Sequence, residues 1–262
     1  MKLPLYQIDA FANRPFEGNP AAVIPLDKWL SDELMQAIAE ENNLAETAFF
    51  VPTQGGFHIR WFTPNNEVKL CGHATLASAY VLFNSLGFNS DTIKFESLSG
   101  ELLVSKKDDL LTLDFPAQTP KECSVSEALI KGLGNLEKKP VEVLRNEDYL
   151  CVFESEEELA RINPDYTHLK HLDLRGVIVT APSKEYDFVV RFFAPKYDIP
   201  EDPVTGSAYT QLVPFWAEKL KKKQFRAKQI SSRGGELLCE LSGDRVLISG
   251  KAIKYLEGNI EL

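Results

Sequence analysis

The sequence of 262 residues predicts an α+β protein with two similar halves, each with mostly antiparallel strands around a central helix. The first observation is a repeat. Three short segments recur in the second half in the same order: residues 57–64 as 188–195, 71–74 as 205–208, and 100–103 as 235–238. The offset grows only from 131 (188 − 57) to 135 (235 − 100), so the repeat indicates a duplicated fold. The second observation is that each half contains β-rich runs followed by one long apolar segment.

The first half predicts its elements in a clear order. Residues 1–9 alternate like a strand, and Ser31 is placed to cap a helix over residues 32–42. Residues 48–51 form a β-rich run. Residues 73–86 then predict a helix that is apolar on nearly every side, which is typical of a buried helix.

The second half repeats this plan. Ser155 begins a capping-box pattern for a short helix, and residues 177–179 form a β-rich run. Residues 207–220 predict the second central helix, with Ser207 as its N-cap. Prolines 116 and 120 interrupt the chain between the halves. We therefore expect domains at 1–116 and 117–262, with an alternative in which the last few C-terminal residues join the first domain.

Composition and charge exclude several functional classes. The net charge is −9, which argues against a basic face that could bind nucleic acid or an anionic membrane. No apolar stretch approaches the roughly 18 residues of a membrane span. The four cysteines are far apart and form no metal-like pair, which favours reduced thiols in a cytoplasmic protein. We predict neither a metal nor a cofactor.

Both central helices are predicted to begin at a glycine, Gly72 and Gly206. Unpaired N–H groups and the partial positive charge of a helix start can bind a carboxylate or a developing anion. Either glycine alone is better explained simply as the start of a helix. Their pairing by duplication favours a ligand site.

The two halves differ where chemistry is expected. Glu46 lies among apolar neighbours before a strand, where burial would raise its pKa toward that of a general acid or base. Its counterpart at offset 131 is Val177, so the acid belongs to one half. Asp202 is matched by Val68, so this acid also occurs in one half only. For Glu46 an exposed loop position, and for Asp202 a simple turn, remain open alternatives.

Cys71, His73 and Thr205 test possible mechanisms. A thiol at a helix start has a lowered pKa and can act as a base or nucleophile. A racemase with two thiols needs a second cysteine, but Thr205 stands at the matching position. His73 is a candidate proton carrier or ligand donor, with a purely structural role as the alternative.

Several motifs together resemble one known family. They are residues 16–21 (FEGNPA), 44–47 (LAET), 67–75 (EVKLCGHAT) and 202–208 (DPVTGSA). In this order, over nearly the whole chain, they resemble the PhzF-like phenazine-biosynthesis family, which shares the diaminopimelate epimerase fold. The resemblance implies two pseudo-symmetric barrels, each around a central helix, with the site between them, and it implies a homodimer.

The best-known member of that family isomerises trans-2,3-dihydro-3-hydroxyanthranilate without a cofactor. The resemblance implies that Glu46 moves a proton between ring carbons. It also implies that His73, Asp202 and Ser207 bind the substrate, and that Gly72 and Gly206 offer it backbone N–H groups. Further candidates for the site are Cys71, Thr205, Asn19 in the FEGNPA motif, and Tyr209, which stands where the family often has a histidine.

Three functions remain open at this point. The leading hypothesis is a cofactor-independent isomerase of a small cyclic carboxylate, with Glu46 as the acid/base. The second is an amino-acid epimerase or racemase that uses Cys71 and another base. The third is a non-catalytic carboxylate-binding protein.

Overall fold

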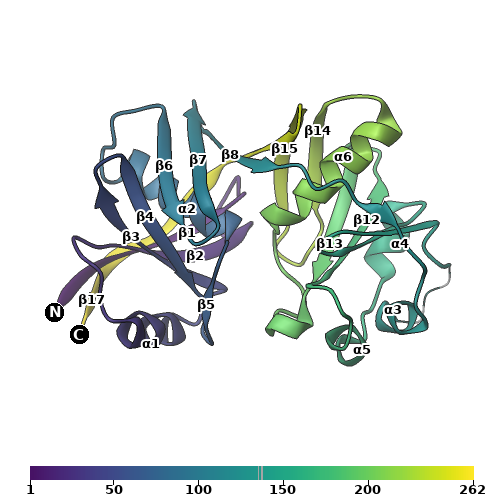
Figure 1. Ribbon diagram of the computed structural model, residues 1–262, viewed down its shortest axis with the longest axis horizontal. Coiled ribbons are helices and arrows are strands. Elements are labelled where there is room, and N and C mark those ends of the chain that lie inside the picture. The colour runs from purple at the N-terminus through teal and green to yellow at the C-terminus, as the bar shows by residue number, and fades with distance from the viewer. Residues whose placement is uncertain (135, 137) are drawn as a thin grey trace. The chain divides into compact units, whose positions relative to one another are not determined.

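The computed structural model describes residues 1–134, 136 and 138–262, which form two compact units. Unit 1 comprises Met1–Phe115 and Ile248–Leu262, and unit 2 comprises Pro116–Leu247. The chain therefore returns to the first unit for its last residues. The labels of Figure 1 identify the elements of each unit.

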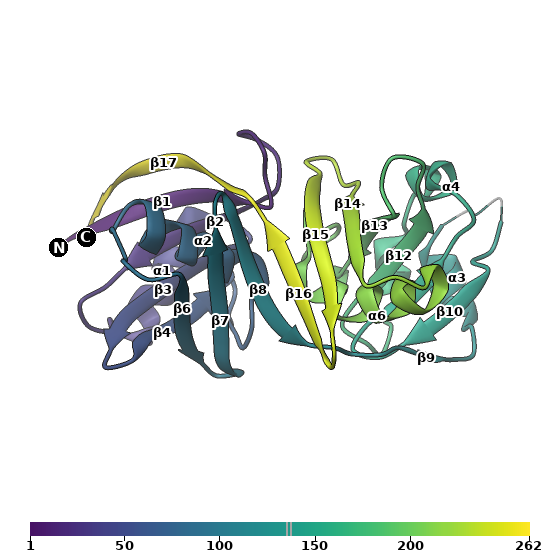
Figure 2. The same cartoon turned by 90° about the horizontal axis from the view of Figure 1, so that it is seen from above.

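Unit 1 is a mostly antiparallel assembly of strands. Its strands are β1 (Lys2–Ala10), β2 (Asn19–Pro25), β3 (Glu46–Thr53), β4 (Gly56–Phe62), β5 (Glu67–Val68), β6 (Thr92–Ser97), β7 (Gly100–Lys107), β8 (Leu110–Pro116) and β17 (Ala252–Glu261). The pairs β2 with β3 and β4 with β6 are parallel. Figure 2 shows β17 running beside β1, with which it pairs antiparallel along its length. This pairing explains why the C-terminal residues belong to unit 1.

Two helices complete unit 1. Helix α1 (Asp32–Asn42) begins as predicted, because the Ser31 hydroxyl accepts a hydrogen bond from the Leu34 amide. Helix α2 (Gly72–Asn84) is buried along most of its length and packs against β1, β2 and β3 (Figure 1). It ends two residues before the predicted Leu86, since Gly87 adopts a left-handed φ of 68° just beyond it.

Unit 2 repeats the arrangement with further short helices. Its strands are β9 (Lys121–Glu122), β10 (Glu142–Arg145), β11 (Tyr149–Val152), β12 (Val177–Pro182), β13 (Phe188–Phe193), β14 (Gln224–Gln229), β15 (Gly235–Ser242) and β16 (Arg245–Gly250), whose last three residues belong to unit 1. Its short helices are α3 (Glu127–Gly132), α4 (Glu156–Arg161), α5 (Tyr166–Lys170) and a 3₁₀ turn, η1 (Pro195–Tyr197). Here β11 with β12 and β13 with β14 are parallel, which matches the two parallel pairs of unit 1.

The start of the second central helix differs from the prediction. A 3₁₀ turn, η2 (Gly206–Ala208), precedes helix α6 (Tyr209–Leu220), and Ala208 occupies the N-cap position. The predicted N-cap, Ser207, is therefore wrong, because its hydroxyl instead accepts a hydrogen bond from Arg175. Downstream, α6 packs into its own unit: the Trp216 ring stacks on Phe188 of β13 with centroids 5.4 Å apart.

The repeated arginines make the duplication visible in the contacts. Arg60 Nε and Nη2 each donate to a carboxylate oxygen of Glu67 at 2.7 Å. Arg191 makes the same two-pronged contact with Glu201, at 2.7 and 2.9 Å. Two bonds from one guanidinium to one carboxylate fix its orientation. The pairs therefore hold the strand of each unit against the segment that leads to its central helix.

Candidate active site

A group of three buried side chains lies at the start of α2 in unit 1. Glu46 begins β3, Cys71 is the N-cap residue of α2, and His73 lies in its first turn. The imidazole lies between the other two groups: Nδ1 is 3.5 Å from Cys71 Sγ, and Nε2 is 3.1 Å from Glu46 Oε2. The exposed fractions are only 8%, 6% and 5% for Glu46, Cys71 and His73. Sequence reasoning named all three residues, and the structure brings them together.

The Cys71 thiol differs from the expectation. A helix start was expected to lower its pKa, but burial and the neighbouring Glu46 carboxylate raise the pKa of Cys71 to about 11, against the opposing effect of His73. Loss of hydration therefore outweighs the helix dipole here. The thiol is protonated near neutral pH and is not prepared to act as a base.

His73 responds in the other direction. Burial disfavours its charged form, but Cys71 and Glu46 on its two sides outweigh burial and raise the pKa of His73 above the ordinary 6.5. The 3.1 Å contact between Nε2 and Oε2 lacks the alignment of a hydrogen bond, although the atoms are close enough for an ion pair. Both atoms are thus buried without an aligned partner among the described residues, which is unusual for buried polar groups.

The backbone at this helix start is also available for binding. Gly72 is the first residue of α2, and the side chain of the N-cap residue Cys71 makes no capping hydrogen bond there. Asn19 is fully buried at the start of β2, two residues before Ala21, which pairs with Glu46. The site residues of unit 1 therefore lie at one end of β2, β3 and α2.

A second polar group surrounds the start of η2 in unit 2. The Thr205 hydroxyl donates to Asp202 Oδ2 at 2.5 Å, and both residues are 7% exposed. Gln229 accepts from the Thr205 amide at 2.9 Å and donates to the Asp202 carbonyl at 2.8 Å. Thr205 therefore holds Asp202 in place. Gly206 follows directly and is buried.

Two charged residues near Ser207 were missed by sequence reasoning. Arg175 donates through Nε and Nη2 to the Asp148 carboxylate, at 2.9 and 2.5 Å, and through Nη1 to Ser207 Oγ at 3.0 Å. Asp148 is fully buried. Asp148 immediately precedes β11 and Arg175 lies two residues before β12, positions that by themselves are equally typical of a charge in a solvated loop.

The strand register corrects the counterpart of Glu46. Arg60 pairs with Phe49, whereas its repeat Arg191 pairs with Val179. Glu46 lies three residues before Phe49, and Gly176 lies three residues before Val179. Gly176 is therefore the counterpart of Glu46, and the expected match to Val177 is wrong by one position. A Cβ at Gly176 would lie 2.6 Å from Phe192 Cζ, which leaves no room for an acidic side chain. The conclusion that the acid belongs to one half is therefore strengthened.

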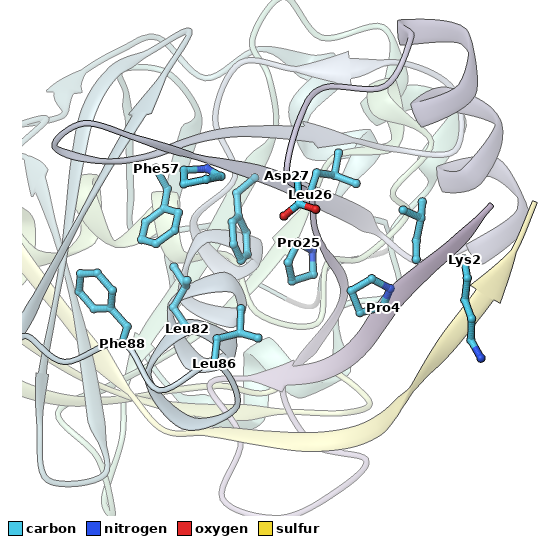
Figure 3. A pocket seen from close by; sticks show the side chains of 12 residues that line it. Lys2, Pro4, Pro25, Leu26, Asp27, Phe57, Leu82, Leu86 and Phe88 are labelled. Atoms are coloured by element: carbon cyan, nitrogen blue, oxygen red, sulfur yellow. The ribbon is translucent and has the colours of Figure 1, made fainter.

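Tyr209 lies in the core of unit 2. Its side chain is fully buried, its ring centroid is 6.2 Å from that of Phe188, and burial raises its pKa well above the ordinary value. A separate apolar pocket of about 470 Å³ lies in unit 1 (Figure 3). Its 12 lining residues include Pro25, Phe57, Leu82 and Asp27. It contains neither Glu46 nor His73, so it is not part of the group described above.

The donor atoms of Glu46, Cys71 and His73 lie within 4.8 Å of one another, a spacing at which a metal ion could be held. Both ring nitrogens of His73 already face a neighbour, however. This contact pattern favours a chain of proton-carrying groups. No helix among the described residues has the length and apolar character needed to cross a membrane.

Comparison with known proteins identifies close relatives. Residues 8–258 match the family model described as phenazine biosynthesis-like protein. The chain is 51% identical to an uncharacterized isomerase from Pseudomonas aeruginosa, over 100% of both chains. It also matches the crystal structure of a PhzF family phenazine biosynthesis protein from Enterococcus faecalis, with 46% identity, full coverage of both chains and a TM-score of 0.96.

A more distant structure extends the fold comparison. A hydroxyproline epimerase from Agrobacterium vitis matches over 99% of this chain and 92% of its own, with 10% identity and a TM-score of 0.63. At this identity the match shows the fold alone. It confirms the predicted α+β class with an epimerase-like fold.

Proposed function

Because the chain belongs to the phenazine biosynthesis-like (PhzF) family and is an isomerase, we propose that it moves a proton between carbon atoms of a small cyclic carboxylate. The reaction needs no cofactor in this proposal. The observation that carries it is the buried Glu46 carboxylate, 3.1 Å from His73 Nε2. The substrate is of the trans-2,3-dihydro-3-hydroxyanthranilate type, as the family resemblance implies.

Glu46 performs the proton transfer. In its ionised form the carboxylate takes a proton from one ring carbon, and the protonated form then returns it to another, so the enzyme is restored after each turnover. Burial supports this role because a site that excludes water limits loss of the proton to solvent. His73 binds and polarises the substrate beside Glu46.

Substrate binding is assigned to the helix starts and their neighbours. Gly72 and Gly206 offer backbone N–H groups, and Asp202 and Ser207 contact polar groups of the substrate. Supporting this, Asp202 is buried and oriented by Thr205.

An epimerase that uses Cys71 as its base is less well supported. The Cys71 thiol is protonated near neutral pH. The position where a second thiol would be needed holds Thr205, whose hydroxyl donates a hydrogen bond to Asp202. Exchange of α-protons of amino acids in heavy water, abolished by Cys71→Ser, would favour the epimerase. The isomerase proposal predicts no such exchange.

The proposal is tested by turnover of trans-2,3-dihydro-3-hydroxyanthranilate. Wild type should isomerise it without added metal or cofactor, and Glu46→Gln should lose roughly 10² to 10⁴ in kcat, the usual contribution of a general acid/base. Glu101→Gln is the matched control, since Glu101 is an exposed glutamate of unit 1. Equal turnover by Glu46→Gln and by the control would overturn the assignment. Binding of the compound without any conversion would favour a carboxylate-binding protein.

Two further expectations remain proposals. The family resemblance implies a homodimer, which light scattering on the purified chain would test. The four scattered cysteines led us to expect a cytoplasmic protein, which fractionation of the source cells would test.

A further inference from the structure

Arg175 occupies a place in unit 2 that corresponds closely to that of Glu46 in unit 1. Gly176 is the counterpart of Glu46 by strand register, so Arg175 lies one residue away from it. The contacts are also analogous. Glu46 lies against His73, the second residue of α2, and Arg175 donates to Ser207, the second residue of η2. The two units thus place opposite charges beside matching helix positions.

The Arg175 guanidinium is held by several neighbours. Nε and Nη2 donate to the buried carboxylate of Asp148, and the Gln211 side-chain amide donates to the same carboxylate at 3.2 Å. The guanidinium carbon lies 5.4 Å from the centre of the Phe192 ring. Only Nη1 remains to reach Ser207 Oγ. The direction of that nitrogen is therefore fixed by its neighbours.

This arrangement determines what the Ser207 hydroxyl can do. A guanidinium only donates hydrogen bonds, so Ser207 Oγ must act as the acceptor toward Arg175. The hydroxyl proton of Ser207 is then directed elsewhere. Ser207 is half-buried, and its hydroxyl donates no hydrogen bond to another described residue, so this proton is free to reach a ligand. A donor polarised by a neighbouring cation suits a carboxylate.

The charges near Arg175 argue against a direct ion pair with a substrate. Asp148 is in contact with the guanidinium, and Glu147 Oε1 lies 3.6 Å from Nη1. One positive charge therefore already faces two carboxylates. Arg175 is better suited to orient a neutral donor than to supply free positive charge.

We propose that Arg175, held by Asp148, is a positioning residue that fixes Ser207 as the hydrogen-bond donor to the substrate carboxylate. The inference rests on the proposed function for the carboxylate nature of the substrate. It adds a specific division of tasks, in which Glu46 moves the proton and the Arg175–Ser207 pair recognises the carboxylate.

A double-mutant cycle on ligand binding tests the proposal. Binding of anthranilate, a flat cyclic carboxylate, is measured by calorimetry for wild type, Arg175→Lys, Ser207→Ala and the double variant. Each single change should weaken binding about tenfold to a hundredfold, the range for a hydrogen bond to a charged group. The double variant should be no weaker than Ser207→Ala, because Arg175 acts through Ser207. Anthranilamide, which lacks the charge, should bind weakly to all four proteins.

Several outcomes would overturn the proposal. Additive losses of affinity in the double variant would mean that Arg175 acts independently of Ser207. An unchanged affinity of Ser207→Ala for anthranilate would mean that Ser207 is not the donor to the carboxylate. Failure of wild type to bind anthranilate would also contradict it. Arg145→Lys is the matched control, since Arg145 pairs with an aspartate on the surface of the same unit. If Arg175→Lys does not fold, Asp148→Asn loosens the same guanidinium and should show the same coupling to Ser207.

Failure of this inference is distinguishable from failure of the proposed function. The binding cycle requires no turnover. Coupled losses of anthranilate binding in a protein that isomerises nothing would leave the inference standing and remove the isomerase. An active isomerase in which the two single changes weaken anthranilate binding additively would leave the proposed function standing and remove the inference.

Discussion

Removal of the Asp148 carboxylate should strongly destabilise the protein. Asp148 is fully buried and accepts three hydrogen bonds, two from Arg175 and one from Gln211. In Asp148→Ala the guanidinium would lose its partner, and the Gln211 amide would lose its acceptor. Loss of one member of a buried ion pair leaves the other charge uncompensated, which costs about 3–5 kcal/mol.

The structure places the expected loss at the lower end of that range. The Arg175 side chain remains 25% exposed, so water can partly solvate the guanidinium once Asp148 is gone. We therefore expect the free energy of unfolding to fall by about 3 kcal/mol. Replacing Arg175 as well, in Asp148→Ala/Arg175→Met, should recover much of this loss because no buried charge is left.

Urea unfolding followed by circular dichroism measures these differences. The control is Glu101→Ala, which breaks an exposed ion pair with Lys94 and should have little effect. The reasoning would be refuted if Asp148→Ala lost no more than the control. It would also be refuted if the double variant were less stable than Asp148→Ala.

Three further predictions concern packing and titration. Gly176→Ala should lower the free energy of unfolding by about 1–3 kcal/mol, because its Cβ would clash with Phe192, whereas Gly55→Ala, with open space around it, should leave the urea midpoint unchanged. The thiolate absorbance of wild type minus Cys71→Ser should rise with a midpoint near pH 11, and a midpoint below pH 9 would contradict the burial of this thiol. The imidazole of His73 should titrate by NMR above pH 6.5, with His73→Asn identifying its signal, and a midpoint below 6.5 would count against the ion pair. Since the folded-state pKa is raised, the stability that His73 contributes should be fully present below pH 6.5 and lost as the pH rises through the raised pKa.

The central elements of the fold were predictable because they depend on local patterns and on the repeat. The apolar run that forms α2 is buried, as its composition indicates, and Ser31 caps α1 through a contact three residues away. The repeated helix-start motif led to Cys71 and His73, and the apolar neighbours of Glu46 led to that residue; the structure brings the three together. These inferences needed no knowledge of distant contacts.

The wrong predictions depend on contacts between distant residues. Serine is a typical N-cap residue, but the Ser207 hydroxyl accepts a hydrogen bond from Arg175, which lies 32 positions earlier. Cys71 lies at a helix start, yet burial and the Glu46 charge outweigh the helix dipole. Val177 was chosen by a constant offset, whereas strand pairing shifts the true counterpart to Gly176.

Arg175 and Asp148 show why part of the site escaped sequence reasoning. Each lies before a β-rich run and by itself suggests a solvated loop charge. Only the parallel pairing of β11 with β12 brings the two segments together. Two such charges become a buried pair through tertiary structure, and a single sequence contains no direct sign of it.

The central claim is that Glu46 carries the proton of the isomerisation, and turnover in heavy water tests it most directly. Wild type and Glu46→Gln are incubated with trans-2,3-dihydro-3-hydroxyanthranilate in D₂O, and the product and recovered substrate are analysed by NMR. Wild type should form the isomer with the transferred hydrogen largely retained as protium at the carbon that receives it, and Glu46→Gln, although folded, should form almost none. Isomer formation by Glu46→Gln at the wild-type rate and with the same labelling would contradict the claim.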